Sequence, residues 1–287
     1  MNQRGGRVDF QRLQKKVLAY FKRLCLLTIA SVRVLIHCLF HPEKLYMLLF
    51  SFYSTINAFY QNSHGHLRNF AGTLTFQQIK DKSIFARCNY FSSDLDIAYP
   101  VETQILGVLV AYFKPKKIFD IGTYNGFTTL HFAYNTDDDA VIYTLDLPPD
   151  FIASTKEKMA KYAYDDLMAV DLSTRNINKR MYKNDPQGAK IRELFGDSMA
   201  FDFTPFHGKM DLIFIDGNHS YPYVRSDTEN AFKMLAKGGV IIWHDFDYII
   251  HRDIFKYLNH LSEKQKIYSI PNTRFAIYSE KIEDPSF

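Results

Sequence analysis

Carboxylate and imidazole side chains follow two apolar runs in the second half of the chain. The run MDLIFI ends in Asp216, with His219 three residues further on, and the run VIIW ends in His244 and Asp245. Such runs predict buried parallel strands, whose carboxyl ends lie at one edge of a sheet. Two carboxylates and an imidazole meeting there predict a divalent-metal site at Asp216, His244 and Asp245. Oxygen ligands favour Mg²⁺ or Ca²⁺, and the imidazole extends the choice to Mn²⁺, Fe²⁺ or Zn²⁺.

Each of these residues also has a purely structural interpretation. Asp216 could cap the turn that follows it, His219 could belong to a hydrogen-bonded turn, and His244 could bond a neighbouring backbone group. We favour the functional interpretation for Asp216, because strand ends are where open sheets bind ligands. For His219 the two interpretations balance, and for His244 we prefer the structural one.

The stretch KKIFDIGTYNG predicts a strand, a glycine turn and the start of a helix. This arrangement forms nucleotide pockets at the carboxyl edge of an open α/β sheet. The glycine spacing is Gly122-x-x-x-Gly126, so the dinucleotide pattern G-x-G-x-x-G is absent and no third glycine approaches a pyrophosphate. Asp120 precedes the turn as a candidate ligand-binding carboxylate, with turn formation as its structural alternative.

Two further strand ends carry polar residues. The run AVIYTL ends in Asp146, where a carboxylate can accept hydrogen bonds from ribose hydroxyls. A ribose-binding carboxylate without a diphosphate cradle indicates an adenosyl ligand that lacks phosphates, of which S-adenosylmethionine is the common one. The run IRELF leads to Asp197 and Ser198, which are placed to meet the edge of an adenine.

Strands alternate with helices through the last two thirds of the chain. This order predicts an α/β fold with a doubly wound, mainly parallel Rossmann-like sheet and an antiparallel C-terminal hairpin. The expected helices cover residues 99–113, 127–134, 153–170, 223–235 and 250–261, and the expected strands cover 117–121, 140–145, 191–195, 210–215, 240–243, 267–270 and 274–278. Residues 171–190 are polar and basic, and for them we favour a surface loop over a lid.

The composition fits one α/β domain with an extension, because 47% of the 287 residues are hydrophobic and can bury a substantial core. Cys25, Cys38 and Cys88 are far apart and form no C-x-x-C pair. This favours a reducing compartment over disulfides or a zinc site, so we expect a cytoplasmic protein. The net charge of +4 is mild and does not by itself indicate nucleic acid.

Residues 1–60 are predicted to form a basic and apolar helical extension. Seven arginines and lysines in residues 1–23 face a single aspartate, and two apolar runs follow, at 24–40 and 45–60. Both runs are shorter than the about 20 residues of a membrane-spanning helix. The extension either lies on the inner face of an anionic membrane or packs on the catalytic domain or on a second subunit, as in a homodimer. Residues 61–98 are expected to be a connector or a cap.

From about residue 99 to its C-terminus the chain resembles the class I S-adenosylmethionine-dependent methyltransferases. It is most similar to the small-molecule O-methyltransferases of the catechol and caffeoyl-CoA type and their bacterial relatives. Five motifs carry the resemblance in the expected order: FDIGTYNGFTT (119–129), YTLD (143–146), FGDS (195–198), FIDGNHSY (214–221) and LAKGGVIIWHDF (235–246). Together they are specific for the fold and the cofactor, whereas any one of them alone is a weak signal.

The resemblance implies roles for individual residues. Cofactor contacts fall on the methionine-side residues Asp120, Gly122, Tyr124, Gly126 and Thr128, on Asp146 for the ribose, and on Asp197 and Ser198 for the adenine. The metal-binding aspartate falls on Asp216 and the family's lysine base on His219, whose imidazole can take a proton near neutral pH. Relatives carry Asp-Asp or Asp-Asn where this chain has His244-Asp245, so the metal, and with it a catechol-like acceptor, stays open.

Three functional hypotheses are consistent with these residues. The first is O-methylation of a small hydroxylated molecule, with a divalent metal as an open addition. The second is a metal-dependent hydroxylase of the same fold, which would need iron. The third is a membrane-associated protein that binds the cofactor without turnover. A nicotinamide dehydrogenase is disfavoured by the missing third glycine, and a nucleic-acid partner by the absence of a concentrated basic face on residues 99–287.

Overall fold

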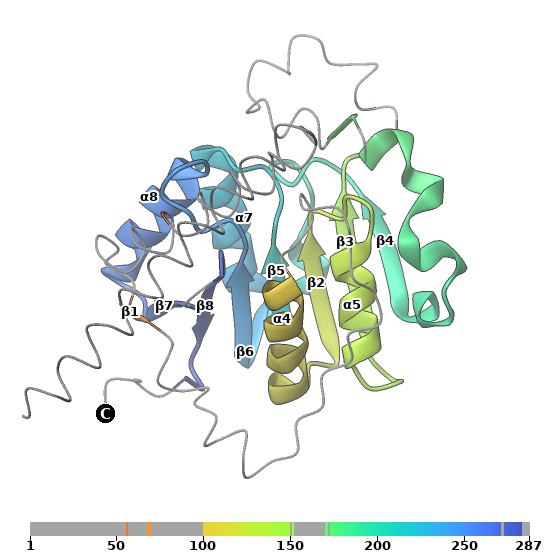
Figure 1. Ribbon diagram of the computed structural model, residues 1–287, viewed down its shortest axis with the longest axis horizontal. Coiled ribbons are helices and arrows are strands. Elements are labelled where there is room, and N and C mark those ends of the chain that lie inside the picture. Colours follow the sequence, from red (N-terminus) through yellow and green to blue (C-terminus); the bar gives the residue numbers. More distant parts are fainter. Residues whose placement is uncertain are drawn as a thin grey trace, which may run out of the picture. The chain divides into compact units, whose positions relative to one another are not determined.

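The computed structural model describes residues 56, 68–69, 100–149, 151, 170–171, 173–270 and 273–282 (Figure 1). By its internal contacts the chain divides into two compact units, Met1–Ile56 and Asn57–Phe287. Most of the predicted extension at 1–60 and of the predicted helix at 153–170 lies outside the described residues, so both stay predictions. Within the described part, no helix has the length and apolar character needed to cross a bilayer.

The described strands form one eight-stranded sheet in the order β1-β7-β8-β6-β5-β2-β3-β4. They are β1 (Arg68–Asn69), β2 (Lys117–Ile121), β3 (Val141–Asp146), β4 (Ile191–Phe195), β5 (Met210–Ile215), β6 (Leu235–Trp243), β7 (Ile267–Ser269) and β8 (Ala276–Ser279). Only β8 runs antiparallel to its neighbours in this sheet, β6 and β7. The predicted α/β fold, with a mainly parallel sheet and an antiparallel C-terminal hairpin, is therefore confirmed.

The described α-helices are α4 (Pro100–Phe113), α5 (Phe127–Asn135), α7 (Tyr221–Met234) and α8 (Arg252–Ser262). Each begins and ends within two residues of the expected helix. The start of α7 is earlier than expected because Pro222 fits the first turn of a helix, where no backbone N–H is needed. The expected strand at 240–243 is longer than predicted, since Leu235 is already extended where α7 ends and pairs there with Met210.

Both faces of the sheet are buried, and the two cores alternate along each strand. In β2, Ile118 packs in one core with Leu109 of α4, while its neighbour Phe119 packs in the other core with Leu258 of α8. The helices α4 and α5 thus cover one face, and α7 and α8 cover the other (Figure 1). Strands buried on both faces explain why the apolar runs of the sequence are continuous rather than alternating.

The surface loop favoured for residues 171–190 is not what the structure shows. The described part of this segment contains consecutive 3₁₀ turns at Ile177–Lys179 (η5), Met181–Asn184 (η6) and Pro186–Lys190 (η7). Arg180 and Tyr182 within it are only 1% and 4% exposed. The polar composition was misleading because the charge of Arg180 is used in internal ion pairs.

Candidate functional site

The glycine turn after β2 is needed for a close approach of two backbones. Gly122 has φ +102°, and a Cβ atom at this position would lie 2.0 Å from the carbonyl oxygen of Asp216. Gly126 has φ +79°, and a Cβ there would lie 2.5 Å from the ring of Tyr182. Both predicted cofactor glycines therefore have a packing role in the protein itself, which a larger residue would disturb.

Gly122→Ala is expected to destabilise the protein several times more than Gly208→Ala. Both glycines have positive φ, a conformation that costs an alanine about 1 to 2 kcal/mol of conformational energy. Gly208 has open space within 4 Å of the added Cβ, whereas Gly122 faces the Asp216 carbonyl. Urea unfolding of both variants measures the difference. If both variants lose the same free energy of unfolding, the close contact between Gly122 and the Asp216 carbonyl does not contribute to stability.

Asp120 is fully buried at the end of β2. Its Oδ2 accepts hydrogen bonds from the hydroxyls of Thr129 at 2.6 Å and Thr144 at 2.9 Å. Its Oδ1 has no partner among the described residues. Burial raises the pKa of Asp120 to about 7, although the two threonines oppose the shift. This carboxyl group keeps one hydrogen-bonding position for a ligand or a water molecule.

Asp146, the predicted ribose carboxylate, ends β3 and already has partners. Its Oδ1 accepts the N–H of Leu147 at 2.8 Å, and its Oδ2 accepts from Ser173 and from Arg180 at 2.5 Å each. Burial raises the pKa of Asp146, and the charge of Arg180 offsets part of the shift. The hydroxyl of Ser173 also donates to the carbonyl of Tyr124, at 3.3 Å. Ser173 and Arg180 had no signal in the sequence, because they come from the segment expected to be a loop.

The predicted adenine-side residues follow β4. Asp197 accepts the backbone N–H of Met199 and the hydroxyl of Tyr223, both at 3.0 Å. Ser198 lies near Asp227 of α7, a fully buried carboxyl group that no motif of the sequence indicated. Burial raises the pKa of Asp227 to about 7, and Ser198 lowers it in part.

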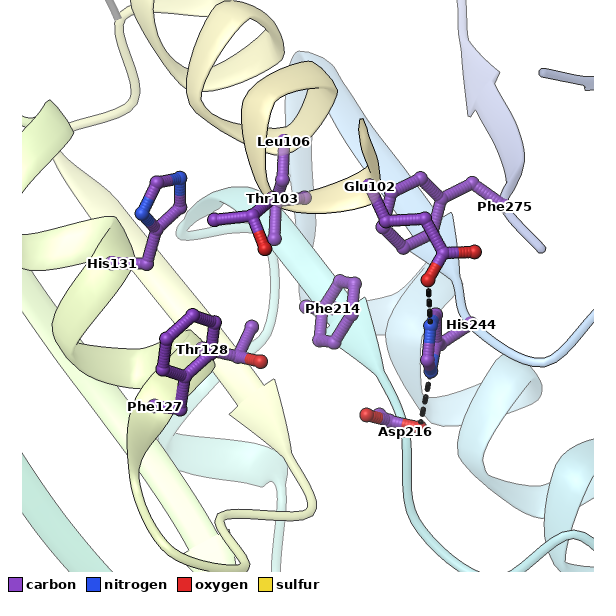
Figure 2. Close-up of a pocket in the computed structure, with 10 residues that line it drawn as sticks. All are labelled: Glu102, Thr103, Leu106, Phe127, Thr128, His131, Phe214, Asp216, His244 and Phe275. Carbon is purple, nitrogen blue, oxygen red and sulfur yellow. Dashed lines mark hydrogen bonds and ion pairs between the residues drawn. The ribbon is translucent and has the colours of Figure 1, made fainter. Parts of the chain in front are cut away.

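His244 lies between two carboxylates. Its Nε2 is 3.2 Å from Oε2 of Glu102 and its Nδ1 is 3.1 Å from Oδ1 of Asp216 (Figure 2). Burial alone would lower the pKa of His244, but the nearby carboxylates, with Asp245 and Asp216 foremost, hold it well above its usual value. Both ring nitrogens therefore donate, to carboxylates rather than to the backbone group expected from the sequence. One donor atom each of Asp216, His244 and Asp245, the metal set predicted from the sequence, lies within 4.8 Å of the other two.

A buried ion-pair network extends from His244 across the site. Arg274 bonds Glu102 of α4 through Nη2 at 3.1 Å and Asp245 through Nη1 at 2.6 Å. The first of these contacts spans 172 positions of the sequence, so no local pattern predicts it. Glu102 had one signal, since it interrupts the apolar run of its helix. The pKa values of Glu102 and Asp216 are both lowered to about 2, because their cationic neighbours outweigh the effect of burial.

His219 and Asp245 meet at the neighbouring strand ends. Nε2 of His219 is 3.1 Å from Oδ2 of Asp245 and 4.0 Å from Oδ1 of Asp216. Asp245 has φ +53°, an unusual conformation for a residue other than glycine. Cationic neighbours, His244 and Arg274 first among them, hold the pKa of Asp245 well below its usual value despite burial. His251, to which the sequence motifs assigned no role, also belongs to this group, with Nδ1 at 3.6 Å from Oδ1 of Asp245.

A small pocket lies between α4, α5 and the ends of β5 and β6 (Figure 2). Three predicted site residues, Thr128, Asp216 and His244, line it. The other lining residues are Glu102, Thr103, Leu106, Phe127, His131, Phe214 and Phe275. Burial lowers the pKa of His131 to about 4, so this ring is neutral. The pocket is apolar with polar groups at two ends, as small-molecule sites generally are.

Comparisons with known proteins give one family match. Residues 119–246 match the model of a family described as a methyltransferase domain. The search of curated proteins gives no match. The matched stretch begins in β2 and ends just after β6, so it includes every residue that the sequence predicted for the site.

Several solved structures are similar to the chain. The methyltransferase PaMTH1 of Podospora anserina is 17% identical, over 72% of this chain and 94% of that one, with a TM-score of 0.49. The O-methyltransferase TomG of Streptomyces achromogenes is 12% identical, over 80% and 97%, with a TM-score of 0.44. An O-methyltransferase from Bacillus cereus is 14% identical, over 80% and 99%, with a TM-score of 0.43. Because all three TM-scores are below 0.5, these likenesses add nothing to the family match.

Proposed function

We propose that the chain transfers a methyl group from S-adenosylmethionine to a hydroxyl oxygen of a small molecule. The match of residues 119–246 to the model of a methyltransferase domain supports this proposal. The observation that carries this proposal is the pocket of Figure 2, which Thr128 and Asp216 both line. In open α/β sheets, this carboxyl edge is the usual ligand site.

The residues at this edge fit the parts of a sulfonium nucleoside. Thr128 offers a hydroxyl in the pocket for the amino-acid end, and Asp120 offers its unpartnered Oδ1 at the neighbouring strand end. Asp146 would take the ribose hydroxyls, sharing its carboxylate with Ser173 and Arg180. The adenine would lie against Asp197 and Ser198, as the resemblance implies. When bound, S-adenosylmethionine supplies an electrophilic methyl group.

The acceptor hydroxyl would approach Asp216 and His219, and its proton would pass to His219. The alternatives in the group are poor bases: the pKa of Asp216 is lowered to about 2, that of Asp245 is also lowered, and His244 already carries its proton. An imidazole is the side chain that takes a proton near neutral pH. Asp245, 3.1 Å from Nε2 of His219, would hold the imidazolium that forms.

His219→Gln is expected to lower kcat about 10² to 10⁴-fold, the usual range for loss of a general base. Binding of S-adenosylmethionine should be unaffected, because His219 lies outside the predicted cofactor residues. His207→Gln is the matched control, since His207 is exposed and away from the site. Single-turnover transfer of a labelled methyl group and calorimetry with the cofactor separate the two effects. An unchanged kcat in His219→Gln would remove the base from the proposal.

The acceptor can be identified by mass spectrometry of products formed from a cell extract and labelled S-adenosylmethionine. A labelled small molecule bearing a new O-methyl group supports the proposal. Calorimetric binding of S-adenosylmethionine without any methylated product would favour a protein that binds the cofactor without turnover. Heat with NADH and none with S-adenosylmethionine would overturn the cofactor assignment. The predicted membrane contact and homodimer involve residues 1–60, which lie mostly outside the described part of the chain.

A further inference from the structure

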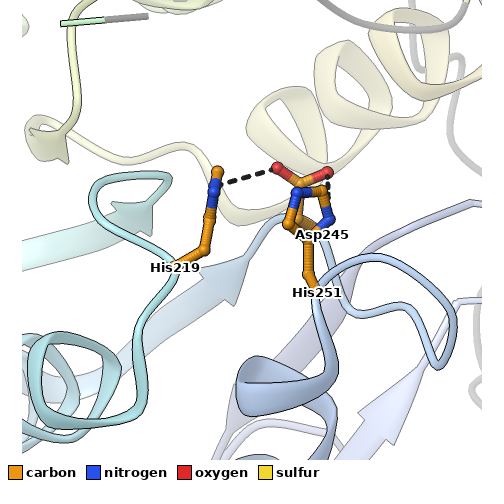
Figure 3. Close-up of side chains that lie close together, drawn as sticks. All are labelled: His219, Asp245 and His251. Carbon is orange, nitrogen blue, oxygen red and sulfur yellow. Dashed lines mark ion pairs between the residues drawn. The ribbon is translucent and has the colours of Figure 1, made fainter. Parts of the chain in front are cut away.

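Two imidazoles and a carboxylate converge from three separate segments at one edge of the site. His219 comes from the loop after β5, Asp245 from the end of β6, and His251 from the residue before α8 (Figure 3). A donor atom from each of the three lies within 4.8 Å of donor atoms from the other two. We propose that His219, Asp245 and His251 bind one divalent transition-metal ion.

One pair of donors has the spacing that such an ion needs, and the third donor lies within 4.8 Å of both. Nε2 of His219 and Oδ2 of Asp245 are 3.1 Å apart, and the two imidazole rings have their centroids 4.3 Å apart. Metal–ligand bonds of about 2.0 to 2.2 Å at tetrahedral or octahedral angles place neighbouring donors about 3 to 3.6 Å apart. Two imidazoles with one carboxylate favour Zn²⁺, Fe²⁺, Co²⁺ or Ni²⁺ over Mg²⁺ and Ca²⁺. This set shares only Asp245 with the metal site predicted from the sequence.

The orientation of His251 is fixed by a second carboxylate. Nδ1 of His251 donates to Oδ2 of Asp247 at 2.8 Å, and Asp247 is fully buried. Oδ1 of Asp247 accepts the backbone N–H groups of Ile249 and Ile250 at 2.7 Å each, so the carboxylate cannot turn away. A carboxylate on one ring nitrogen sets the tautomer that leaves the other nitrogen for a metal, as in many metal centres. With this tautomer, Nε2 of His251 would be the ring nitrogen available to an ion.

Carboxylates are concentrated around the three residues. Glu102, Asp216 and Asp247 belong with Asp245 to one network, in which Arg274 pairs with Glu102 and Asp245. A divalent ion would be attracted to these carboxylates.

A bound ion would change the role of His219, because Nε2 could not hold the ion and take the acceptor's proton at the same time. This consequence rests on the proposed function, but binding of the ion itself does not.

Binding can be measured on the full-length chain without any methyl acceptor. Protein freed of metal by a chelator is titrated with Co²⁺, followed by visible absorption, and with Zn²⁺, followed by calorimetry in two buffers. We expect one ion per chain. His251→Gln and His219→Gln should each weaken binding at least tenfold. Asp247→Asn should weaken it about 10 to 100-fold, as is usual when an orienting carboxylate is lost.

His207→Gln and Asp216→Asn serve as controls, since neither side chain belongs to the proposed ligand set. His207→Gln should bind as the unchanged protein does. Circular dichroism confirms that each variant is folded, and Asp247→Asn, which removes no ligand, tests the site even where a ligand variant unfolds. Unchanged affinity in His251→Gln and Asp247→Asn overturns the proposal. Loss of metal binding in Asp216→Asn alone also overturns the proposal, because the ion would then bind at Asp216, His244 and Asp245, the site predicted from the sequence.

The outcomes also separate this inference from the proposed function. Cofactor binding by metal-free protein, with no Co²⁺ spectrum, refutes the metal site and leaves the methyltransferase intact. A Co²⁺ spectrum that depends on His251, in a protein that binds no S-adenosylmethionine, supports the metal site and refutes the proposed function.

Discussion

Replacing Glu102 by glutamine is expected to lower the free energy of unfolding by about 3 to 5 kcal/mol at neutral pH, the usual loss when one partner of a buried ion pair is removed. Glu102 is fully buried and contacts Arg274 and the imidazolium of His244. A neutral amide would remove one of the carboxylates that each cation contacts, which leaves Arg274 with Asp245 and His244 with Asp216 and Asp245. The side chain keeps its size, so the loss reports charge rather than packing.

The loss in Glu102→Gln should depend on pH in a defined direction. The pKa of Glu102 falls from 4.5 to about 2 in the folded protein, so its contribution is complete above pH 4.5 and disappears as the pH falls towards 2. Urea unfolding of both proteins between pH 2.5 and 7 gives the difference. Glu229→Gln, which removes an exposed pair with Arg225, is the control and should cost about 0.5 kcal/mol or less. A difference that stays constant over this range would contradict the assignment.

Replacing Asp120 by asparagine is expected to have the opposite effect and to stabilise the protein at alkaline pH. The pKa of Asp120 rises from 3.8 to about 7 on folding, because the carboxylate is buried without a cation beside it. The folded protein therefore binds more protons than the unfolded chain between those values, and stability falls as the pH rises through that window. Three pKa units correspond to a gain of up to about 4 kcal/mol above pH 7. Near pH 4 the gain should vanish.

The same Asp120→Asn variant should bind S-adenosylmethionine more weakly, since a carboxylate oxygen is lost at the site. Unfolding at pH 4, 6 and 8, with calorimetry at pH 8, measures both effects. Asp202→Asn is the control, because this exposed aspartate has a lowered pKa and should show no alkaline gain. A stability gain that does not change with pH would show that the carboxylate is not held protonated by its surroundings.

Most of the sheet was predictable from the sequence because most of its strands contain short apolar runs, whereas β1 lies in the segment expected to be a connector or a cap. β2, β4 and β5 have the bounds that the pattern predicted, and the parallel arrangement placed Asp120, Asp146 and Asp216 at one edge. Individual cofactor and metal roles stay predictions.

The partners of the site residues were not predictable. Arg274 reaches Glu102 across 172 positions and Arg180 reaches Asp146 across 34, and neither contact leaves a periodic signal. His251 followed the motifs closely but had no metal-ligand spacing to His219, so only the folded chain shows that the two rings meet.

The turn at Gly122 lies where backbone hydrogen bonds connect the ends of β2, β3 and β5. Its N–H bonds the carbonyl of Leu145, and the N–H of Asp216 bonds the carbonyl of Ile121. The loop assigned to the methyl donor and the loop assigned to the acceptor thus share one backbone contact. A side chain at Gly122 would push against the Asp216 carbonyl, so a single substitution there should disturb donor and acceptor binding together.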